Sequence, residues 1–165
     1  RNGFKKVVIN IAHLGYMIPE YLGDGSKWDL EIIYSDEQDI GALESAGGII
    51  NALEHLSEEF IVVNGDVWCD YEFDDSLSLD DKLAHLVLVD NPDHNKDGDF
   101  KYMGERYTFS GIGYYSKKMF LGYKKEKLAL APILKDKKNK ISFELYKGEW
   151  RDIGTPERLD EVNNV

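Results

Sequence analysis

The chain has 165 residues and a formal net charge of −11 at pH 7, from 20 Lys and Arg against 31 Asp and Glu. This length suits one domain with a buried core, and the acidic balance argues against nucleic acid or an anionic membrane as a partner. The only cysteine, Cys69, excludes an internal disulfide and favours a reducing compartment, so we expect a cytoplasmic protein.

The first half of the chain alternates between two kinds of apolar pattern. Gly3 is placed to end a helix in the left-handed conformation, and the β-branched run that follows predicts a parallel strand. We expect strands at 7–12, 30–34 and 60–64, helices at 16–22 and 48–56, and polar connections at 23–26 and 35–42. This alternation is typical of an α/β layered domain.

The second half begins with an apolar strand at 83–89 and continues with interleaved aromatic residues and glycines. Between residues 100 and 115 this pattern indicates short, half-exposed strands and turns. We expect a helix at 117–123, a hairpin of strands 141–146 and 149–153 around Lys147-Gly148, and a last helix with Thr155 as N-cap and Pro156 at its first position.

One candidate site lies where the strand at 60–64 ends in Asn64-Gly65-Asp66. Open α/β sheets hold ligands at the carboxyl ends of their strands, and glycine allows close approach. Mg²⁺ prefers one or two carboxylates together with phosphate oxygens and water. The alternative is a simple turn, which such residues often mark.

Asp152 repeats this pattern, because an extended segment again ends in a carboxylate before a glycine and a helix. Asp66 and Asp152 are therefore candidate ligands of one metal ion. The alternative is that Asp152 only helps to cap the helix that begins after Thr155.

Two adjacent glycines, Gly47 and Gly48, join a polar loop to a helix. Exposed backbone N–H groups at a helix start can bind a base or a phosphate. The segment is neither a P-loop nor a dinucleotide fingerprint, because the flanking residues of both motifs are absent.

Five segments in order resemble the sugar-1-phosphate nucleotidyltransferases. They are Leu22-Gly23-Asp24-Gly25-Ser26, Leu43-Glu44-Ser45-Ala46-Gly47-Gly48-Ile49, Asn64-Gly65-Asp66-Val67-Trp68, Phe109-Ser110-Gly111-Ile112 and Trp150-Arg151-Asp152-Ile153-Gly154-Thr155-Pro156-Glu157-Arg158-Leu159. Within this family the chain is most similar to the N-acetylmuramate-1-phosphate uridylyltransferases of bacterial peptidoglycan recycling.

The resemblance implies a Rossmann-like three-layer α/β domain with a mixed, mostly parallel sheet. It implies transfer of a nucleotidyl group, as from UTP to N-acetylmuramate 1-phosphate, with release of pyrophosphate and Mg²⁺ as cofactor. Asp66 and Asp152 match the catalytic, metal-binding aspartates. The resemblance further assigns nucleotide binding to Glu44, Gly47, Gly48, Asn64 and Gly65, and sugar-phosphate binding to Asn91, Ser110 and Gly111.

The Gly-rich loop and Lys-Pro segment with which these enzymes begin have no counterpart here. We therefore expect residues 1–165 to form one nucleotidyltransferase domain without its N-terminal strand and phosphate loop. The alternatives are another hexose-1-phosphate nucleotidyltransferase, of the GDP-mannose or dTDP-glucose type, and a non-catalytic domain that binds a sugar nucleotide.

One further pattern partly matches a calcium-binding loop. Residues 93–99 match the first seven positions of an EF-hand loop, but Gly104 stands where that loop needs Glu. We expect a solvated turn there.

Overall fold

The computed structural model describes residues 3–38, 41–74 and 77–164. The chain folds into two compact units, 1–58 with 117–138 and 59–116 with 139–165. The expectation of one undivided domain stays a prediction. Among the described residues, no helix combines the length and the apolar character needed to cross a membrane.

The first unit combines a parallel strand pair with helices. Strand β1 (Lys6–Ile11) pairs in parallel with β2 (Glu31–Asp36), and α1 (Met17–Leu22) lies between them in sequence. Helix α2 (Glu44–Ala52) packs against β1, β2 and α3 (Leu130–Asp136). Apolar side chains from α2, α3 and the segments around them are buried in this unit: Ile11, Leu43, Ala46, Ile49, Ile50, Ala52, Met119, Phe120, Leu130, Ile133 and Leu134.

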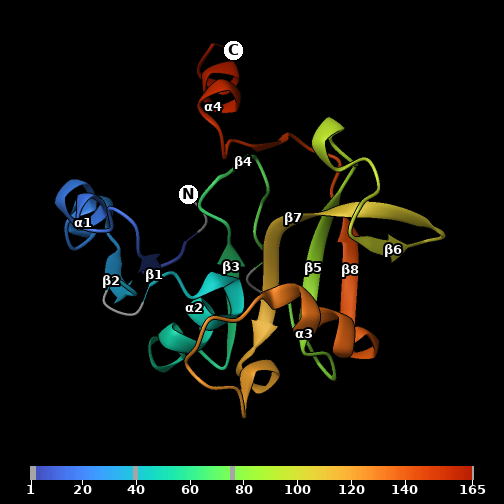
Figure 1. The fold of residues 1–165 in the computed structure, drawn as a ribbon, viewed down its shortest axis with the longest axis horizontal. Coiled ribbons are helices and arrows are strands. Elements are labelled where there is room, and N and C mark those ends of the chain that lie inside the picture. Colours follow the sequence, from blue (N-terminus) through green and yellow to red (C-terminus); the bar gives the residue numbers. More distant parts are fainter. Residues whose placement is uncertain (1–2, 39–40, 75–76, 165) are drawn as a thin grey trace. The chain divides into compact units, whose positions relative to one another are not determined.

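The second unit is built on a sheet in the order β3, β7, β5, β8, with β6 paired to β7 (Figure 1). These strands are β3 (Glu59–Val63), β5 (Ala84–Val89), β6 (Phe100–Tyr102), β7 (Glu105–Ser116) and β8 (Ile141–Leu145). A separate antiparallel pair joins β4 (Val67–Cys69) to β9 (Trp150–Asp152), and α4 (Pro156–Asn163) follows β9 at the end of the chain.

The α/β class and the mixed sheet are confirmed, but the sheet is not mostly parallel. Two of the six strand pairings in the described residues are parallel. The twelve-residue strand β7 causes the difference, because it runs antiparallel to β3, β5 and β6. This strand is mostly buried, whereas the aromatic and glycine pattern predicts short, half-exposed pieces.

The predicted hairpin around Lys147-Gly148 is wrong. Strand β8 pairs in parallel with β5, and β9 pairs antiparallel with β4, so the two segments have different partners. Each strand thereby gains a partner from another part of the chain. The segment predicted as a helix from Lys117 is a short 3-10 turn over Lys117–Phe120, and α3 is a helix that the sequence pattern does not indicate.

Helix α2 contains two glycines for reasons of packing. A Cβ on Gly47 would lie 2.3 Å from the carbonyl oxygen of Glu126, and one on Gly48 would lie 2.8 Å from Oε1 of Glu37. The N–H groups of Ala46 and Gly47 both donate to the carbonyl of Leu128, each at 3.0 Å. The two glycines therefore let the 126–128 backbone and the Glu37 carboxylate approach α2.

We predict that Gly47→Ala destabilises the protein. Alanine in a helix interior stabilises by about 1 kcal/mol relative to glycine, but an inserted methyl group in a tight contact costs roughly 1–3 kcal/mol. Because the blocking atom is backbone, the second effect should prevail, and thermal unfolding should shift down by several degrees. Ser45→Ala on the exposed side of α2 is the control, and an equal melting temperature for both variants would contradict the packing argument.

Candidate active site

The pairing of β4 with β9 brings two distant carboxylates together. Asp66 lies in the turn between β3 and β4, and Asp152 is the last residue of β9. In the antiparallel register Val67 stands opposite Asp152, and the N–H of Ile153 donates to the carbonyl of Asp66 at 2.8 Å. The backbone ladder, rather than side-chain contact, places the two residues side by side.

Both carboxylates flank Gly154. A Cβ on Gly154 would lie 3.0 Å from Oδ2 of Asp66 and 3.1 Å from Oδ1 of Asp152. The two oxygens are therefore separated by no more than the sum of these distances. A larger residue at this position would press against both carboxylates, so glycine keeps the space between them open.

Asp152 is surrounded by hydrogen-bond donors. Its Oδ1 accepts from the N–H of Gly154 at 2.9 Å and lies 2.6 Å from Nη1 of Arg158, while its Oδ2 lies 3.2 Å from Nε2 of His94. Partial burial pushes the pKa of Asp152 upward, but the Gly154 N–H and the Arg158 guanidinium outweigh it and hold the pKa below its ordinary value. Asp152 is therefore ionised at neutral pH.

The start of α4 holds Arg158 in place. Thr155 is the N-cap, and its Oγ1 accepts from the N–H of Arg158 at 3.3 Å, with Pro156 at the first helical position. This confirms the predicted cap and assigns capping to Thr155. The Asp152 carboxylate binds the Gly154 N–H, which precedes the helix, so it is not needed as the cap.

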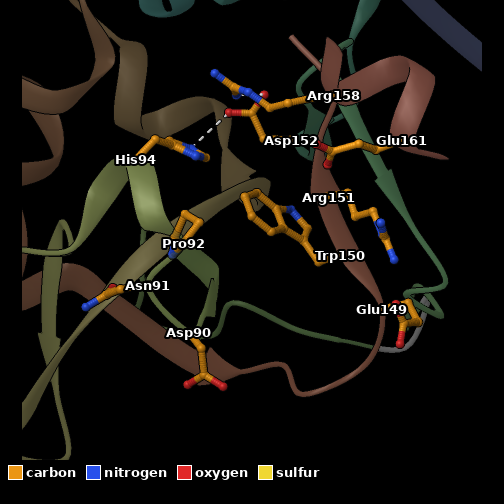
Figure 2. A pocket seen from close by; sticks show the side chains of 10 residues that line it. All are labelled: Asp90, Asn91, Pro92, His94, Glu149, Trp150, Arg151, Asp152, Arg158 and Glu161. Atoms are coloured by element: carbon orange, nitrogen blue, oxygen red, sulfur yellow. Dashed lines mark ion pairs between the residues drawn. The ribbon is translucent and has the colours of Figure 1, made fainter. Parts of the chain in front are cut away.

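A pocket of about 470 Å³ opens beside Asp152. Figure 2 shows Asp152 between His94 and Arg158, with the Trp150 ring below them and Asn91 at the far side. The pocket thus combines an aromatic ring with charged groups of both signs. Its lining includes four carboxylates, from Asp90, Glu149, Asp152 and Glu161, and three cationic or potentially cationic side chains, from His94, Arg151 and Arg158.

The polar atoms of the Asn91 side chain form hydrogen bonds with the loop that carries His94 and with β7. Its Nδ2 donates to the carbonyls of Lys96 at 3.2 Å and Arg106 at 3.1 Å, and its Oδ1 accepts from Oγ1 of Thr108 at 2.9 Å. Asn91 lines the pocket, and its amide shapes the 92–99 loop.

Ser110 and Gly111 lie at an irregularity of β7. Leu86 and Leu88 of β5 stand opposite Gly113 and Phe109, so four residues of β7 span two of β5. Gly111 has φ +83°, which favours glycine. Ser110 is buried, its hydroxyl accepts from the N–H of Ile112 at 3.1 Å, and its carbonyl accepts from Nε1 of Trp150 at 2.9 Å.

Asn64 and Gly65 continue from β3 toward Asp66. The N–H of Asn64 donates to the carbonyl of Gly111 at 2.9 Å, and the Asn64 side chain covers the Cα of Gly111. Gly65 is exposed, has no positive φ in the left-handed region, and a Cβ there would meet no atom within 4 Å. The fold gives no reason for glycine at position 65.

The remaining predicted nucleotide residues belong to the first unit. Glu44 begins α2 with φ 61°, a left-handed conformation that is uncommon for this residue type, and its Oε1 lies 3.5 Å from Nζ of Lys127. Gly47 and Gly48 are buried, and the Gly47 N–H already has a partner. The expected exposed N–H group at Gly47 is not observed, and the nucleotide contacts of all three residues stay a prediction.

Sequence reasoning missed His94 and Arg158 as site residues. The Thr155-Pro156 cap signal indicates that Arg158 lies in a first helical turn, but no sequence signal relates it to Asp152. Among the described residues, no group of three or more His, Cys, Asp or Glu side chains is arranged to hold a metal ion, including the loop at 93–99. That loop is instead tied by Arg106, which donates to the carbonyls of Asp97 and Gly98, each at 2.8 Å.

Comparison with solved structures identifies the fold. A putative glucose-1-phosphate thymidylyltransferase from Bacillus anthracis, in complex with sucrose, superposes with a TM-score of 0.76 over 95% of this chain and 74% of its own, at 16% identity. HddC from Yersinia pseudotuberculosis, also solved as a complex with GMP-PN, gives 0.74 over 97% and 78%, at 20% identity.

Sequence comparison identifies the protein family as well as the fold. The nucleotidyl transferase family model matches residues 1–105. N-acetylmuramate alpha-1-phosphate uridylyltransferase of Neisseria meningitidis serogroup B is 42% identical over 180 aligned residues, which cover 97% of this chain and 78% of that protein. UTP–glucose-1-phosphate uridylyltransferase of Synechocystis is 30% identical over 99 residues, 54% of this chain and 26% of its own. The family match, the long similarity to the Neisseria enzyme and the shared fold establish that the chain belongs to the sugar-1-phosphate nucleotidyltransferases.

Proposed function

We propose that the protein transfers a uridylyl group from UTP to N-acetylmuramate 1-phosphate and releases pyrophosphate. The 42% identity to the Neisseria uridylyltransferase supports this choice of substrates within the family. The observation that carries the chemistry is the meeting of Asp66 and Asp152 on either side of Gly154. The proposal places the reaction in the cytoplasm, where UTP is made and where a protein with the single cysteine Cys69 keeps its thiol reduced.

The proposed reaction needs no protein nucleophile. An oxygen of the sugar phosphate attacks the α-phosphorus of UTP, a new P–O bond forms there, and the bond to the bridging oxygen breaks as pyrophosphate leaves with that electron pair. Such transfers depend on positioning and on stabilisation of negative charge. The role of this chain is therefore to hold both phosphates in line and to supply charge-balancing groups beside them.

The donor set around Gly154 fits Mg²⁺. Two carboxylates offer hard oxygen ligands, and Mg²⁺ usually takes one or two carboxylates and completes its shell with water and substrate phosphates. Asp66 and Asp152 would hold the ion, and when bound it would neutralise charge on the phosphate oxygens. A larger cage of protein ligands is not expected for this metal.

The other predicted residues take two kinds of role in this proposal. Gly65 leaves open space one residue before Asp66, which suits close approach of the nucleotide. Asn91, Ser110 and Gly111 act on the sugar-phosphate side by building the 92–99 loop and the β7 irregularity, since the side-chain polar atoms of Asn91 and Ser110 already bind protein groups. Glu44, Gly47 and Gly48 are proposed to contribute to the nucleotide side through the start of α2.

Asp66→Ala should abolish most of the activity with UTP and N-acetylmuramate 1-phosphate. We expect pyrophosphate release to fall at least a hundredfold, about 2.7 kcal/mol of transition-state stabilisation. The control is Asp81→Ala, which removes an exposed carboxylate paired only with surface lysines. Equal rates for the Asp66 variant and the native protein would remove this carboxylate from the mechanism.

The variant Gly65→Ala tests whether Gly65 is needed for nucleotide binding or for folding. Because a Cβ at this position meets no protein atom within 4 Å, we expect the free energy of unfolding to change by less than about 0.5 kcal/mol. The KM for UTP should nevertheless rise at least tenfold if the nucleotide approaches this backbone. Full activity of a normally stable Gly65→Ala protein would show that the nucleotide binds elsewhere.

A panel of substrate pairs distinguishes the proposed activity from that of the rival hexose-1-phosphate enzymes and from a non-catalytic domain. With N-acetylmuramate 1-phosphate, glucose 1-phosphate and mannose 1-phosphate each offered with UTP, dTTP and GTP, we expect the highest kcat/KM for UTP with N-acetylmuramate 1-phosphate. A preference for GTP with mannose 1-phosphate, or for dTTP with glucose 1-phosphate, would support the rival hexose enzymes. Binding of sugar nucleotide without pyrophosphate release from any pair would indicate a non-catalytic domain.

A further inference from the structure

Arg158 forms its ion pair with the Asp152 oxygen that lies beside Gly154, where the proposed metal ion would bind. Nη1 of Arg158 lies 2.6 Å from Oδ1 of Asp152. The same oxygen accepts from the Gly154 N–H and is the one that flanks Gly154 together with Oδ2 of Asp66. The guanidinium therefore binds the oxygen of Asp152 that lies beside Gly154, the residue that both carboxylates approach.

A guanidinium at this place competes with a divalent cation for Asp152. Two cations drawn to one carboxylate oxygen repel each other strongly at such short range, especially where the carboxylate is partly buried. The side chains of Asp152 and Arg158 are 26% and 34% exposed, so the pair is shielded from water but Arg158 still reaches solvent. A long side chain with one end open to solvent is able to leave Asp152 without disrupting α4.

A phosphate group bound in the pocket would be a second partner for the Arg158 guanidinium. The pocket is lined by Arg158 and Asp152 together and is open enough for a phosphorylated ligand. Guanidinium matches phosphate with paired hydrogen bonds as well as it matches carboxylate. Resting on the uridylyltransferase function above, we propose that Arg158 exchanges partners, binding Asp152 in the free protein and a substrate phosphate once a divalent cation has bound to Asp152.

The neighbouring cationic residues do not share this geometry. His94 contacts Oδ2 of Asp152, at 3.2 Å, and leaves Oδ1 to Arg158. Arg151 precedes Asp152 on β9, and Figure 2 shows its guanidinium directed away from the Asp152 carboxylate. Arg151 therefore supplies a matched control with the same charge in the same pocket but without the contact.

The first test measures metal affinity directly, with Mn²⁺ as a paramagnetic substitute for Mg²⁺ at an oxygen-ligand site. Free Mn²⁺ is counted by electron paramagnetic resonance as the native protein, Arg158→Gln and Arg151→Gln are titrated without substrate. We expect Arg158→Gln to bind Mn²⁺ about tenfold more tightly than the native protein, equivalent to ~1.4 kcal/mol, and Arg151→Gln to change the Kd less than threefold. An unchanged or weaker Mn²⁺ affinity of Arg158→Gln would overturn the proposal.

A second variant separates charge competition from a loss of helix structure. Arg158→Lys keeps a positive charge at the start of α4 and should keep the native Mn²⁺ affinity within threefold, with an unchanged melting temperature. If the Lys variant binds Mn²⁺ as tightly as the Gln variant does, direct competition by charge is contradicted.

The second test measures coupling to phosphate. Mn²⁺ titrations are repeated with N-acetylmuramate 1-phosphate in one arm and UMP in the other. In the native protein the phosphate ligand should tighten Mn²⁺ binding several-fold, and the ion should tighten phosphate binding by the same factor. In Arg158→Gln this coupling should be at least threefold smaller, leaving the part that direct contact between the ion and the phosphate supplies. A loss of coupling in the sugar arm alone assigns the exchange to the sugar phosphate, a loss in the UMP arm alone assigns it to the nucleotide, and an unchanged coupling in both arms overturns it.

Asp66→Ala distinguishes failure of this inference from failure of the proposed function. Loss of Mn²⁺ binding in Asp66→Ala together with unchanged Mn²⁺ binding in Arg158→Gln would refute only the exchange. Retained Mn²⁺ affinity in Asp66→Ala would refute the metal site on which the proposed function depends.

Discussion

The antiparallel pairing of β4 with β9 is the constraint on which the site depends. It sets Val67 opposite Asp152 and binds the N–H of Ile153 to the carbonyl of Asp66. A shift of one residue in this register would turn Asp152 to the other face of the ribbon and separate the carboxylates. Side chains alone would not hold them together, because two ionised carboxylates repel each other. The backbone ladder opposes that repulsion, and the Gly154 N–H and Arg158 reduce it at Asp152.

A ribbon of two three-residue strands is not stable by itself, so its attachments matter as much as its register. Trp150 donates from its indole to the carbonyl of Ser110, and Asn64 donates from its backbone to Gly111. Both acceptors lie at the β7 irregularity, and irregularities of this kind often redirect a strand next to an active site. Next to Trp150, at the end of the ribbon away from Asp66 and Asp152, Oδ1 of Asp70 accepts from the Glu149 N–H at 2.9 Å and from the Tyr146 hydroxyl. The segment that resembles the family's sugar-phosphate motif therefore also anchors the ribbon that carries Asp66 and Asp152, the carboxylates proposed to bind metal.

Local signals in the sequence predicted the parts of this arrangement that depend on neighbouring residues. The apolar run before Asn64, the Thr155 cap and the carboxylate after each strand follow from short-range preferences and are found where expected. The choice of strand partners is non-local, which is why β8 and β9 were wrongly predicted as a hairpin when their partners are β5 and β4. Arg158 and His94 were missed for the same reason, since their relation to Asp152 exists only after β9, α4 and the 92–99 loop have assembled. The strand-end pattern and the resemblance to the family both point to the two aspartates, whereas the contacts around them are known only from the structure.

The glycines show how far a motif match explains a residue. Gly47, Gly65 and Gly154 all belong to segments that resemble family motifs, yet packing accounts for only two of them. Gly47 is required by the backbone of residues 126–128, whereas Gly154 gives room to the two carboxylates beside it. Gly65 has open space and an unrestricted backbone, so no contact within the protein requires it. A glycine that packing does not explain is better evidence for a ligand than one that packing does explain. The open backbone at Gly65, directly before Asp66, therefore gives stronger support for nucleotide approach than the adjacent pair Gly47 and Gly48, although that pair is the more conspicuous feature of the sequence.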